Sequence, residues 1–486
     1  MPYASTNTPS PGETLSPGRI RLIAMIIGSA LFMEMLDVTI LSTALPTMAQ
    51  DLAVKPLHMS LALTSYLLSL AIFIPVSAIL ADRFGTRMVF RAAILLFTLG
   101  SVLCGQAHSL AFLVFARLLQ GLGGALMMPV GRLILVRCAP KSEYVRALSW
   151  VVVPGFVGPI VGPAVGGIIV TYLSWRWIFF VNVPIGLLGL VLATIYIPEV
   201  REAIRTRFDP LGFVLSGISL ACMVFGLEAL SRGAGDPAYT LGLLGVGAVF
   251  WGLYLIHAQR HPAPILDLKL MRVTTFNVSV IAGALTRISG GGIPFMLPLM
   301  MQLGFGYSPM ASGFILLSGA TGSIVMKAVA TGIIRRWGFR DVMIWNCVIA
   351  SLSIAICAAF RPDWPLALIF AVLLVSGFFQ ALQFTAYNTV AYADLAPEQM
   401  GAATSFYSTF QQLMLSIGIC AAVGVLYLSS VVLGHDKLML DDFSVGFLVM
   451  ALASAAAIPF CARLAPDAGA DMSGHVRGGA KAEVGK

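Results

Sequence analysis

Apolar runs of about 20 residues recur along the whole chain, separated by short polar segments. An α-helix needs about 20 predominantly apolar residues to cross the hydrocarbon core of a bilayer. Because fourteen such runs are present, the pattern predicts an all-α polytopic membrane protein with fourteen transmembrane helices. The predicted spans cover residues 20–44, 60–80, 88–106, 110–132, 146–171, 176–197, 210–230, 238–257, 275–303, 310–333, 342–360, 365–389, 401–428 and 443–463.

The composition supports a membrane protein and excludes an ordinary soluble domain. Hydrophobic residues make up 58% of the 486 residues and charged residues only 11%, whereas soluble domains are about 25% charged. The mean hydropathy is +0.91. The first apolar run is too long, and too acidic, for a cleavable signal peptide, so we expect it to remain a span.

The positions of the basic residues predict the orientation. Of the 30 Lys and Arg residues, 22 fall on one side when the loops are assigned alternately, 5 fall on the other, and Arg117, Arg287 and Lys327 lie within spans. Cytoplasmic loops carry the excess of Lys and Arg. We therefore expect both termini in the cytoplasm and the protein in the inner (cytoplasmic) membrane. The same bias explains the net charge of +8 without a nucleic-acid partner.

A weak internal repeat predicts two equivalent halves. LPTMAQ at 45–50 recurs as LPLMMQ at 297–302, and DRFGTR at 82–87 is echoed by RRWGFR at 335–340, at nearly the same offset. Two related halves are a common transporter plan, with the substrate site near the midplane between them. The predicted units are a disordered tail (1–18), a six-helix bundle (19–198), two inserted spans with their linkers (199–273), a second six-helix bundle (274–463) and a disordered tail (464–486).

Two acids occur in the first span, within MEMLDVTI. A charge at the bilayer centre costs roughly 2.5–3.5 kcal/mol, so Glu34 and Asp37 require a partner or a function. Burial raises the proton affinity of a carboxylate and a nearby cation lowers it. Arg117, which shares one face of the fourth span with Gln120, is a candidate partner. We expect proton coupling at Glu34, Asp37 and Arg117.

Other polar residues within spans are candidates for a substrate cavity. Arg287 in the ninth span lies at about the depth of Glu34 and Asp37, and Lys327 lies nearer the cytoplasmic side, where its long side chain could reach the interface. The predicted cavity residues are Gln120, Arg287, Lys327, Gln380 and Gln383.

Two further motifs concern conformational change. The loop after the second span reads ADRFGTR, in which Asp82, Gly85 and Arg87 are candidates for a latch. The alternative is a basic loop that only sets topology. The fifth span reads GFVGPIVGPAVGG. Its glycines permit close helix contact and its prolines interrupt the backbone hydrogen bonds.

These motifs together resemble the major facilitator superfamily, in its fourteen-span drug:proton antiporter branch (EmrB- and QacA-like), and most of all its MdtD-type multidrug exporters. The resemblance rests on LDVTILSTALP, ADRFGTR, RLLQGLGG and GFVGPIVGPAVGG, and it covers nearly the whole chain between the tails. One departure is Ala78, where the loop motif usually begins with glycine. The resemblance implies proton coupling at Asp37 and Arg117, a latch at Asp82, Gly85 and Arg87, and an antiporter helix at Gly158, Pro159, Gly162 and Pro163.

The expected function is a proton-coupled antiporter that exports small amphipathic compounds. The sequence contains no Walker motif, no HExxH, no GxSxG and no His or Cys metal spacing. We therefore expect no enzyme activity, no metal and no cofactor, with the proton motive force as the energy source. The expected partners are the substrate, protons and the lipid bilayer. We expect a monomer and leave periplasmic or outer-membrane efflux partners open. Two alternatives also stay open: an exporter of an anionic metabolite or its metal chelate, and a proton-coupled importer.

Overall fold

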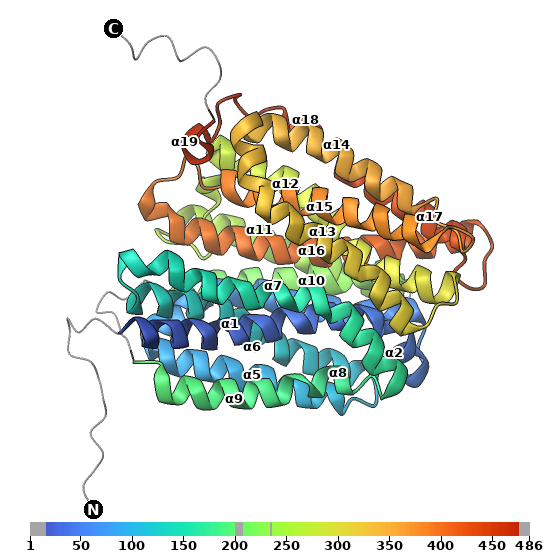
Figure 1. The fold of residues 1–486 in the computed structure, drawn as a ribbon, viewed down its shortest axis with the longest axis horizontal. Coiled ribbons are helices and arrows are strands. Elements are labelled where there is room, and N and C mark those ends of the chain that lie inside the picture. The colour runs from blue at the N-terminus through green and yellow to red at the C-terminus, as the bar shows by residue number, and fades with distance from the viewer. Residues whose placement is uncertain (1–15, 200–207, 234–235, 476–486) are drawn as a thin grey trace, which may run out of the picture.

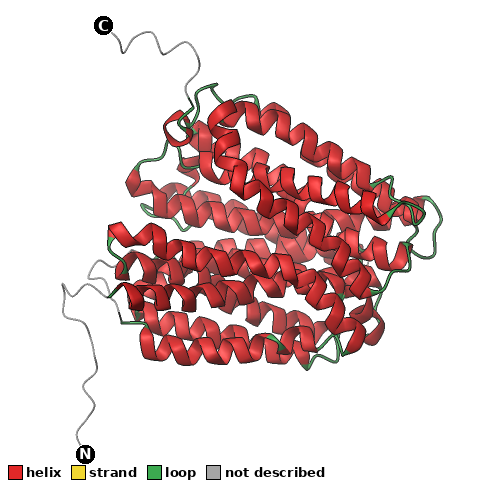
Figure 2. Ribbon diagram, in the orientation of Figure 1, coloured by secondary structure: helices red, strands yellow, loops and turns green. Residues whose placement is uncertain are grey.

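The computed structural model describes residues 16–199, 208–233 and 236–475. The regular elements in these ranges are all helical (Figure 2). Within the described residues, 14 helical segments are long and apolar enough to cross a membrane. The predicted fold class and the predicted number of spans are both confirmed.

The first group of helices runs from the N-terminus to residue 196. Its spans are formed by α1, by α3 together with α4, and by α5, α6, α7 and α9, while α2 and α8 are short. The bounds are α1 Pro17–Ile40, α2 Leu45–Asp51, α3 Ser60–Phe73, α4 Ser77–Phe84, α5 Thr86–Gly105, α6 Leu110–Cys138, α7 Lys141–Tyr172, α8 Trp177–Phe180 and α9 Asn182–Tyr196.

The second group follows an inserted pair of spans. The inserted pair consists of α10 (Pro210–Ser231) and α11 (Pro237–Arg260). The second group comprises α12 Thr274–Leu299, α13 Pro309–Trp337, α14 Phe339–Cys357, α15 Leu366–Val390, α16 Met400–Val432, α17 Leu440–Ala455, and the short helices α18 Ile458–Cys461 and α19 Ala470–Ser473. The domain limits proposed from the sequence remain a prediction.

The two groups lie side by side, with their long helices running in broadly the same direction (Figure 1). Helix α7 of the first group packs along α13 of the second, and α3 packs along α16. The inserted helix α10 packs against α11, α3 and α16. It therefore contacts both groups rather than standing apart from them.

Polar caps fix where several spans begin. A side-chain oxygen at the N-cap accepts one of the backbone N–H groups that the first turn leaves without a partner. Helices α1, α10, α11 and α13 also carry proline in the first turn, where its missing N–H costs nothing. The capping side chains are Ser16, Ser109, Asp209, Asp236 and Ser308.

Hydrogen bonds join the two groups at the end of the molecule where α2 lies, which is the predicted extracellular end (Figure 1). Gln302 Nε2, in the π-helical turn Met300–Gly304, donates to the backbone oxygen of Thr43 at 2.9 Å. The backbone N–H of Met310 donates to Thr171 Oγ1 at 3.2 Å. The described structure is therefore closed at this end by polar as well as apolar contacts.

The end of the chain differs from the predicted disordered tail 464–486. Leu464 is buried against the second group, and α19 follows after a turn at Gly469. Gly469 has a φ of +68°, a conformation that glycine adopts without the strain of a side chain. The apolar packing of Leu464 explains why order extends this far. Residues 1–15 and 476–486 of the predicted tails lie outside the described residues.

Candidate functional site

Asp37 lies at the centre of a buried hydrogen-bond network in the first group. Arg117 Nη1 of α6 donates to its Oδ2 at 2.5 Å. Gln120 Nε2 donates to its Oδ1 at 2.7 Å, and Asn182 Nδ2 of α9 donates to the same oxygen at 3.0 Å. The Asp37 side chain is 1% exposed and that of Arg117 is 0% exposed. The structure thus joins three helices through one carboxylate.

Further contacts hold Arg117 in place. Its Nε donates to the backbone oxygen of Ala62 at 2.8 Å, its Nη1 also donates to Gln120 Oε1 at 2.7 Å, and its guanidinium lies 4.4 Å from the centre of the Tyr66 ring. A buried ion pair is maintained only when additional hydrogen bonds offset the loss of water around both charges. The network supplies such bonds, although Arg117 Nη2 itself has no hydrogen-bond partner in the ranges that the structure describes.

Glu34 does not share the Arg117 partner that the sequence suggested for both acids. It lies one turn before Asp37 on α1 and is only 5% exposed. Its Oε2 has no hydrogen-bond partner within the described residues, and the same is true of the Tyr66 hydroxyl. The two acids therefore occupy different environments, one within a network and one largely outside it.

The predicted latch residues are all held within the first group in this structure. Arg137 Nη2 of α6 lies 2.7 Å from Asp82 Oδ1, so this ion pair joins α4 to α6. Arg87 of α5 donates to the backbone oxygen of Thr194 in α9. Gly85 connects α4 and α5 with a φ of +94°, which explains the glycine.

The glycines of α7 allow that helix to approach its neighbours closely. A Cβ added at Gly158 would stand 2.9 Å from the backbone nitrogen of Leu36, and one at Gly162 would collide with Thr39 of α1. On the opposite face, the backbone at Pro163 lies against Gly313 of α13. Helix α7, with Pro159 and Pro163 inside it, is thus packed tightly between a helix of its own group and a helix of the other group.

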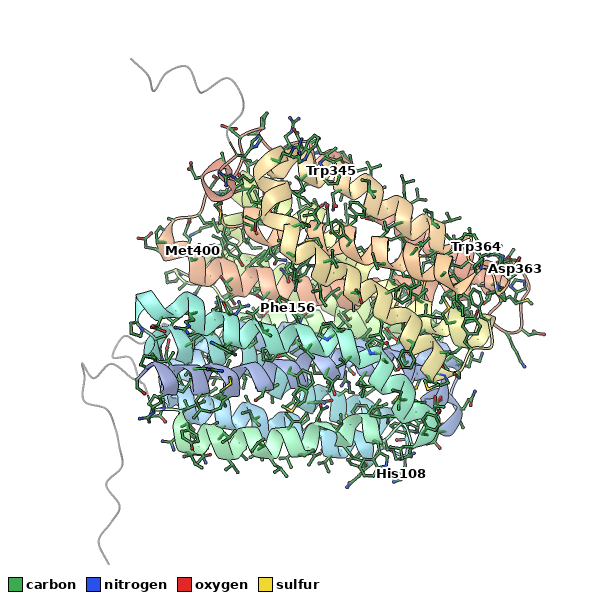
Figure 3. All side chains as sticks on the ribbon, viewed as in Figure 1. His108, Phe156, Trp345, Asp363, Trp364 and Met400 are labelled. Atoms are coloured by element: carbon green, nitrogen blue, oxygen red, sulfur yellow. The ribbon has the colours of Figure 1, made fainter. Side chains whose placement is uncertain are left out.

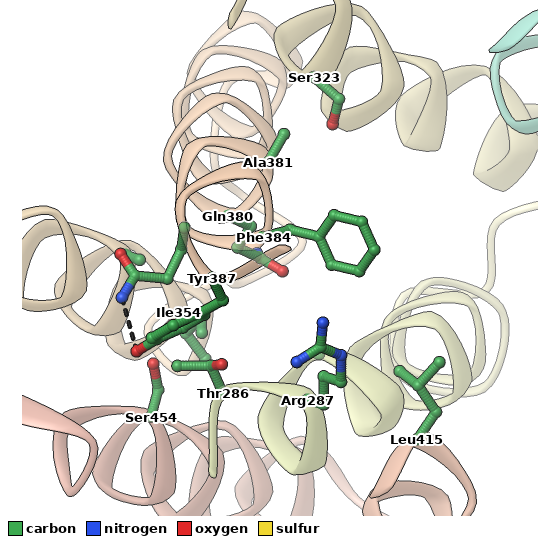
Figure 4. Close-up of a pocket in the computed structure, with 13 residues that line it drawn as sticks. Thr286, Arg287, Ser323, Ile354, Gln380, Ala381, Phe384, Tyr387, Leu415 and Ser454 are labelled. Atoms are coloured by element: carbon green, nitrogen blue, oxygen red, sulfur yellow. Dashed lines mark hydrogen bonds between the residues drawn. The ribbon is translucent and has the colours of Figure 1, made fainter. Parts of the chain in front are cut away.

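Arg287 borders a cavity of about 250 Å³ (Figure 4). Its guanidinium lies 5.0 Å from the centre of the Phe384 ring and 5.2 Å from that of Tyr407, and its Nη2 donates to the Tyr407 hydroxyl at 3.4 Å. Its Nε has no hydrogen-bond partner in the described part of the chain. The lining residues, none of them acidic, are Thr286, Arg287, Gly290, Ser323, Ala350, Ile354, Gln380, Ala381, Gln383, Phe384, Tyr387, Leu415 and Ser454.

The cavity differs in two ways from the one expected at the interface between the halves. All of its lining residues belong to α12–α17 of the second group. Of the five predicted cavity residues, Arg287, Gln380 and Gln383 line it, whereas Gln120 and Lys327 do not. Gln120 belongs to the Asp37 network instead.

Lys327 extends toward the first group rather than into the cavity. Its Nζ lies 2.7 Å from the centre of the Phe156 ring of α7, and Phe156 lies along the boundary between the two groups (Figure 3). A cation over an aromatic face is an attractive contact. Lys327 therefore contributes to the contact between α7 and α13.

Glu228 is a buried acid that the sequence analysis did not single out. It lies in the inserted helix α10 with 0% exposure. Ser60 of α3 donates to its Oε1, and Cys420 of α16 contacts its Oε2 at 3.1 Å. Arg232 Nε lies 3.6 Å from Oε1. One carboxylate thus connects the inserted pair to both groups. The sequence did contain a signal for this site, because the segment GLEAL places a single acid inside a predicted span.

The comparisons with known proteins agree with this architecture. The model described as Major Facilitator Superfamily matches residues 27–419. The chain belongs to the major facilitator superfamily. The chain is also 38% identical over 408 residues to the putative multidrug resistance protein MdtD of Escherichia coli. The match covers 84% of this chain and 86% of that protein. MdtD of a second Escherichia coli strain matches equally well. The resemblance that the motifs suggested is therefore confirmed.

Several solved transporter structures share the fold of this chain at low sequence identity. The POT family transporter PepTSo superimposes with a TM-score of 0.67 at 14% identity, covering 91% of this chain and 97% of that chain. The human organic anion transporter TETRAN gives 0.60 at 12% identity, covering 91% and 99%, and the nucleoside transporter NupG gives 0.61 at 15%, covering 91% and 98%. Family and fold together identify a multi-pass membrane transporter rather than an enzyme.

Proposed function

We propose that this protein is a proton-coupled antiporter that exports small amphipathic compounds. It would lie in the inner membrane with both termini in the cytoplasm. The observation that carries the proposal is the buried network around Asp37. A membrane protein that needed only structural stability here could use apolar packing, because buried ion pairs often cost as much as they contribute. A titratable pair in the membrane interior is the kind of group that transporters use to carry protons.

Protonation of Asp37 supplies the coupling step. A proton on the carboxyl removes the negative charge that holds Arg117, so Arg117 loses its counter-ion while Gln120 and Asn182 keep hydrogen-bonding capacity. The arrangement of α1, α6 and α9 then changes with protonation. Glu34, one turn away with an unpaired oxygen, is the neighbouring carboxyl through which a proton reaches or leaves Asp37.

The conformational change follows from where the groups meet. Thr43 and Gln302 join the two groups at the predicted extracellular end, so this structure corresponds to a state closed toward the outside. Outward release of a substrate requires those contacts to separate, by rocking of one group against the other. The close packing of α7 between α1 and α13 provides the route by which a change in the first group reaches that contact.

A second candidate function is export of an anionic compound or its metal chelate. The observation that favours it is Arg287, whose guanidinium borders a cavity without an acidic lining residue. A buried cation without a counter-ion is unfavourable, and an anionic substrate would provide one. Because MdtD is named for multidrug resistance, we place this candidate second.

The decisive test is substrate-dependent proton flux in proteoliposomes. Purified protein is reconstituted with an internal pH dye, and a panel of cationic, neutral and anionic amphipathic compounds is added under an imposed pH gradient. Antiport predicts proton movement opposite to the compound, and its absence in the Asp37→Asn variant. Proton movement in the same direction as the compound would establish an importer and overturn the proposal.

A further inference from the structure

Three potential metal ligands meet where the inserted pair begins and ends. Asp209 is the N-cap of α10, His257 lies in the last turn of α11, and His261 is the residue that caps α11. Their ligand atoms all lie within 4.8 Å of one another. By the predicted topology this cluster lies at the cytoplasmic side. The sequence analysis predicted no metal site and gave these histidines no role.

The geometry leaves one buried oxygen of the cluster unused. Asp209 Oδ1 accepts the Gly212 N–H at 2.8 Å and lies 2.7 Å from His257 Nε2. Asp209 Oδ2 has no hydrogen-bond partner among the residues that the structure describes, although the residue is only 3% exposed. His261 Nδ1 lies 3.9 Å from that oxygen and accepts a long hydrogen bond, 3.3 Å, from the Ala263 N–H. A buried carboxylate oxygen without a partner is costly.

We propose that Asp209, His257 and His261 form a binding site for a divalent transition metal of the Zn²⁺ class. Imidazole nitrogen and carboxylate oxygen are the ligands such ions take, and three protein ligands with one open position for water complete a tetrahedral shell. The metal would be held by Asp209 Oδ2, His257 Nε2 and His261 Nδ1, and its binding would replace the hydrogen bonds that these two ring nitrogens make with Asp209 Oδ1 and with the Ala263 N–H. His261 is the most exposed of the three side chains, at 26%.

The site clamps the two ends of the inserted pair together. Asp209 fixes the first turn of α10, and His261 begins the linker to the second group. Leu266 of that linker is already held by Tyr254 of α11, whose hydroxyl bonds both its N–H and its backbone oxygen at 2.9 Å. A metal bound to His261 therefore extends an existing attachment of the linker back to the start of α10.

The histidine–aspartate pair at the other end of the protein provides a matched control. His435 Nδ1 lies 3.0 Å from Asp442 Oδ2, but no second histidine joins them within the described residues. A buried histidine–aspartate contact alone, without three converging ligands, should not bind a metal. His435→Ala therefore tests whether any effect is specific to the proposed cluster.

The experiment is Zn²⁺ titration of the full-length protein, purified through a tag without histidine and stripped of metal. We expect one Zn²⁺ per chain by calorimetry and a thermal midpoint that rises with Zn²⁺ concentration. His257→Ala and His261→Ala should each weaken binding at least about tenfold, an effect of the size seen even when an outer-shell partner is removed. Asp209→Asn should also weaken it while keeping the helix cap, so that folding is preserved. His435→Ala should leave binding unchanged.

Co²⁺ in place of Zn²⁺ distinguishes this cluster from the seven cysteines. Binding by histidine and carboxylate gives weak visible d–d bands, whereas thiolate ligation adds a strong near-ultraviolet charge-transfer band. We expect the first spectrum alone. A thiolate band, equal binding in wild type and the Asp209, His257 and His261 variants, or no saturable binding would each overturn the site and leave Asp209 and His257 as a simple hydrogen-bonded pair.

Discussion

Asp37 and Glu228 are both carboxyl groups inside membrane spans, and both are almost completely buried, at 1% and 0% exposure. Their partners differ. Asp37 is bonded by Arg117, Gln120 and Asn182, all of the first group. The partners of Glu228 come from α3 of the first group, from α16 of the second and from the residue that caps the end of its own α10.

This difference separates two ways in which a buried acid can respond to transport. If the groups rock as bodies, the Asp37 network moves as one piece, so only protonation or substrate can change it. The Glu228 contacts cannot all survive such a motion, because Ser60 and Cys420 belong to groups that move apart. Asp37 is thus suited to sense protons, and Glu228 is suited to stabilise one arrangement of the groups.

The largest effect is expected from Asp37→Asn. The variant leaves Arg117 buried without a counter-ion, and breaking one side of a buried pair costs about 3–5 kcal/mol. We expect proton-driven transport to fall to background and thermal stability in detergent to drop. Transport at the wild-type rate under a pH gradient would contradict the role given to Asp37.

The double variant Asp37→Asn/Arg117→Gln separates coupling from folding. It neutralises both partners, so the desolvation cost of the unpaired guanidinium disappears. Thermal stability should recover most of the loss, whereas proton-driven transport should stay at background. Recovery of both properties would mean that the network is structural and that protons are carried elsewhere.

Glu228→Gln should have an intermediate effect, on conformation rather than on proton binding. The amide keeps the shape but replaces charge-assisted contacts with neutral ones, a difference of about 1 kcal/mol, or about fivefold in population. We expect a larger outward-open fraction, seen as longer distances between spin labels attached to cysteines introduced at positions 55 and 437. The background keeps the buried Cys420, which contacts Glu228, and has serine at the other native cysteines.

A buried acid inside a single group provides the control. Asp442 is 0% exposed and accepts hydrogen bonds from Ser429 and from the Met439 N–H, both in the second group. Asp442→Asn should therefore reduce stability without changing the Lys55–Lys437 distance distribution. If both variants shift that distribution alike, the connection made by Glu228 between the groups has no special effect.

Arg287→Gln tests recognition in the second group. No acidic residue lines the cavity, so the substitution leaves no carboxylate there without its cation. We therefore expect the folded fraction of the protein to change little. Transport of anionic compounds should fall about tenfold, as for loss of one charge-assisted interaction of about 1.4 kcal/mol, while cationic compounds are spared. An equal loss for compounds of both charges, measured as initial rates in proteoliposomes, would point to a structural role.

The sequence predicted the parts of the site that carry strong local motifs. The spans could be found because each is a long apolar run. Asp37 and its cation Arg117 could be found because each is a charged residue that interrupts such a run. Asn182 was not among the predicted site residues, because FFVNVP is a mostly apolar segment at the start of the sixth span. Its amide becomes informative only when α9 is placed beside α1.

Contacts between spans that are far apart in the sequence could not be predicted from local sequence patterns. Glu228 belongs to the inserted pair, which has no counterpart in the internal repeat, so nothing indicated that it would meet Ser60 and Cys420. The apolar pattern did place Arg287 within a span, but it could not show that the cavity lies inside one group, because that depends on how α12–α17 pack.

The smallest effect is expected at Asp51, a carboxyl at the water-exposed end of the first group and 45% exposed. Hydrogen bonds from Trp175 and Arg176 lower its pKa from the ordinary value. A lowered folded-state pKa means that this stabilisation is present above the unfolded pKa and is lost as the pH falls through the folded one. Asp51→Asn should therefore be slightly less stable than wild type near neutral pH. The two should converge in thermal stability as the pH falls from about 4, the ordinary pKa of aspartate, through the lowered folded-state pKa. Because exposed pairs contribute little, the difference should be far smaller than that for Asp37→Asn. A comparable loss would mean that burial is not what separates these carboxyl groups.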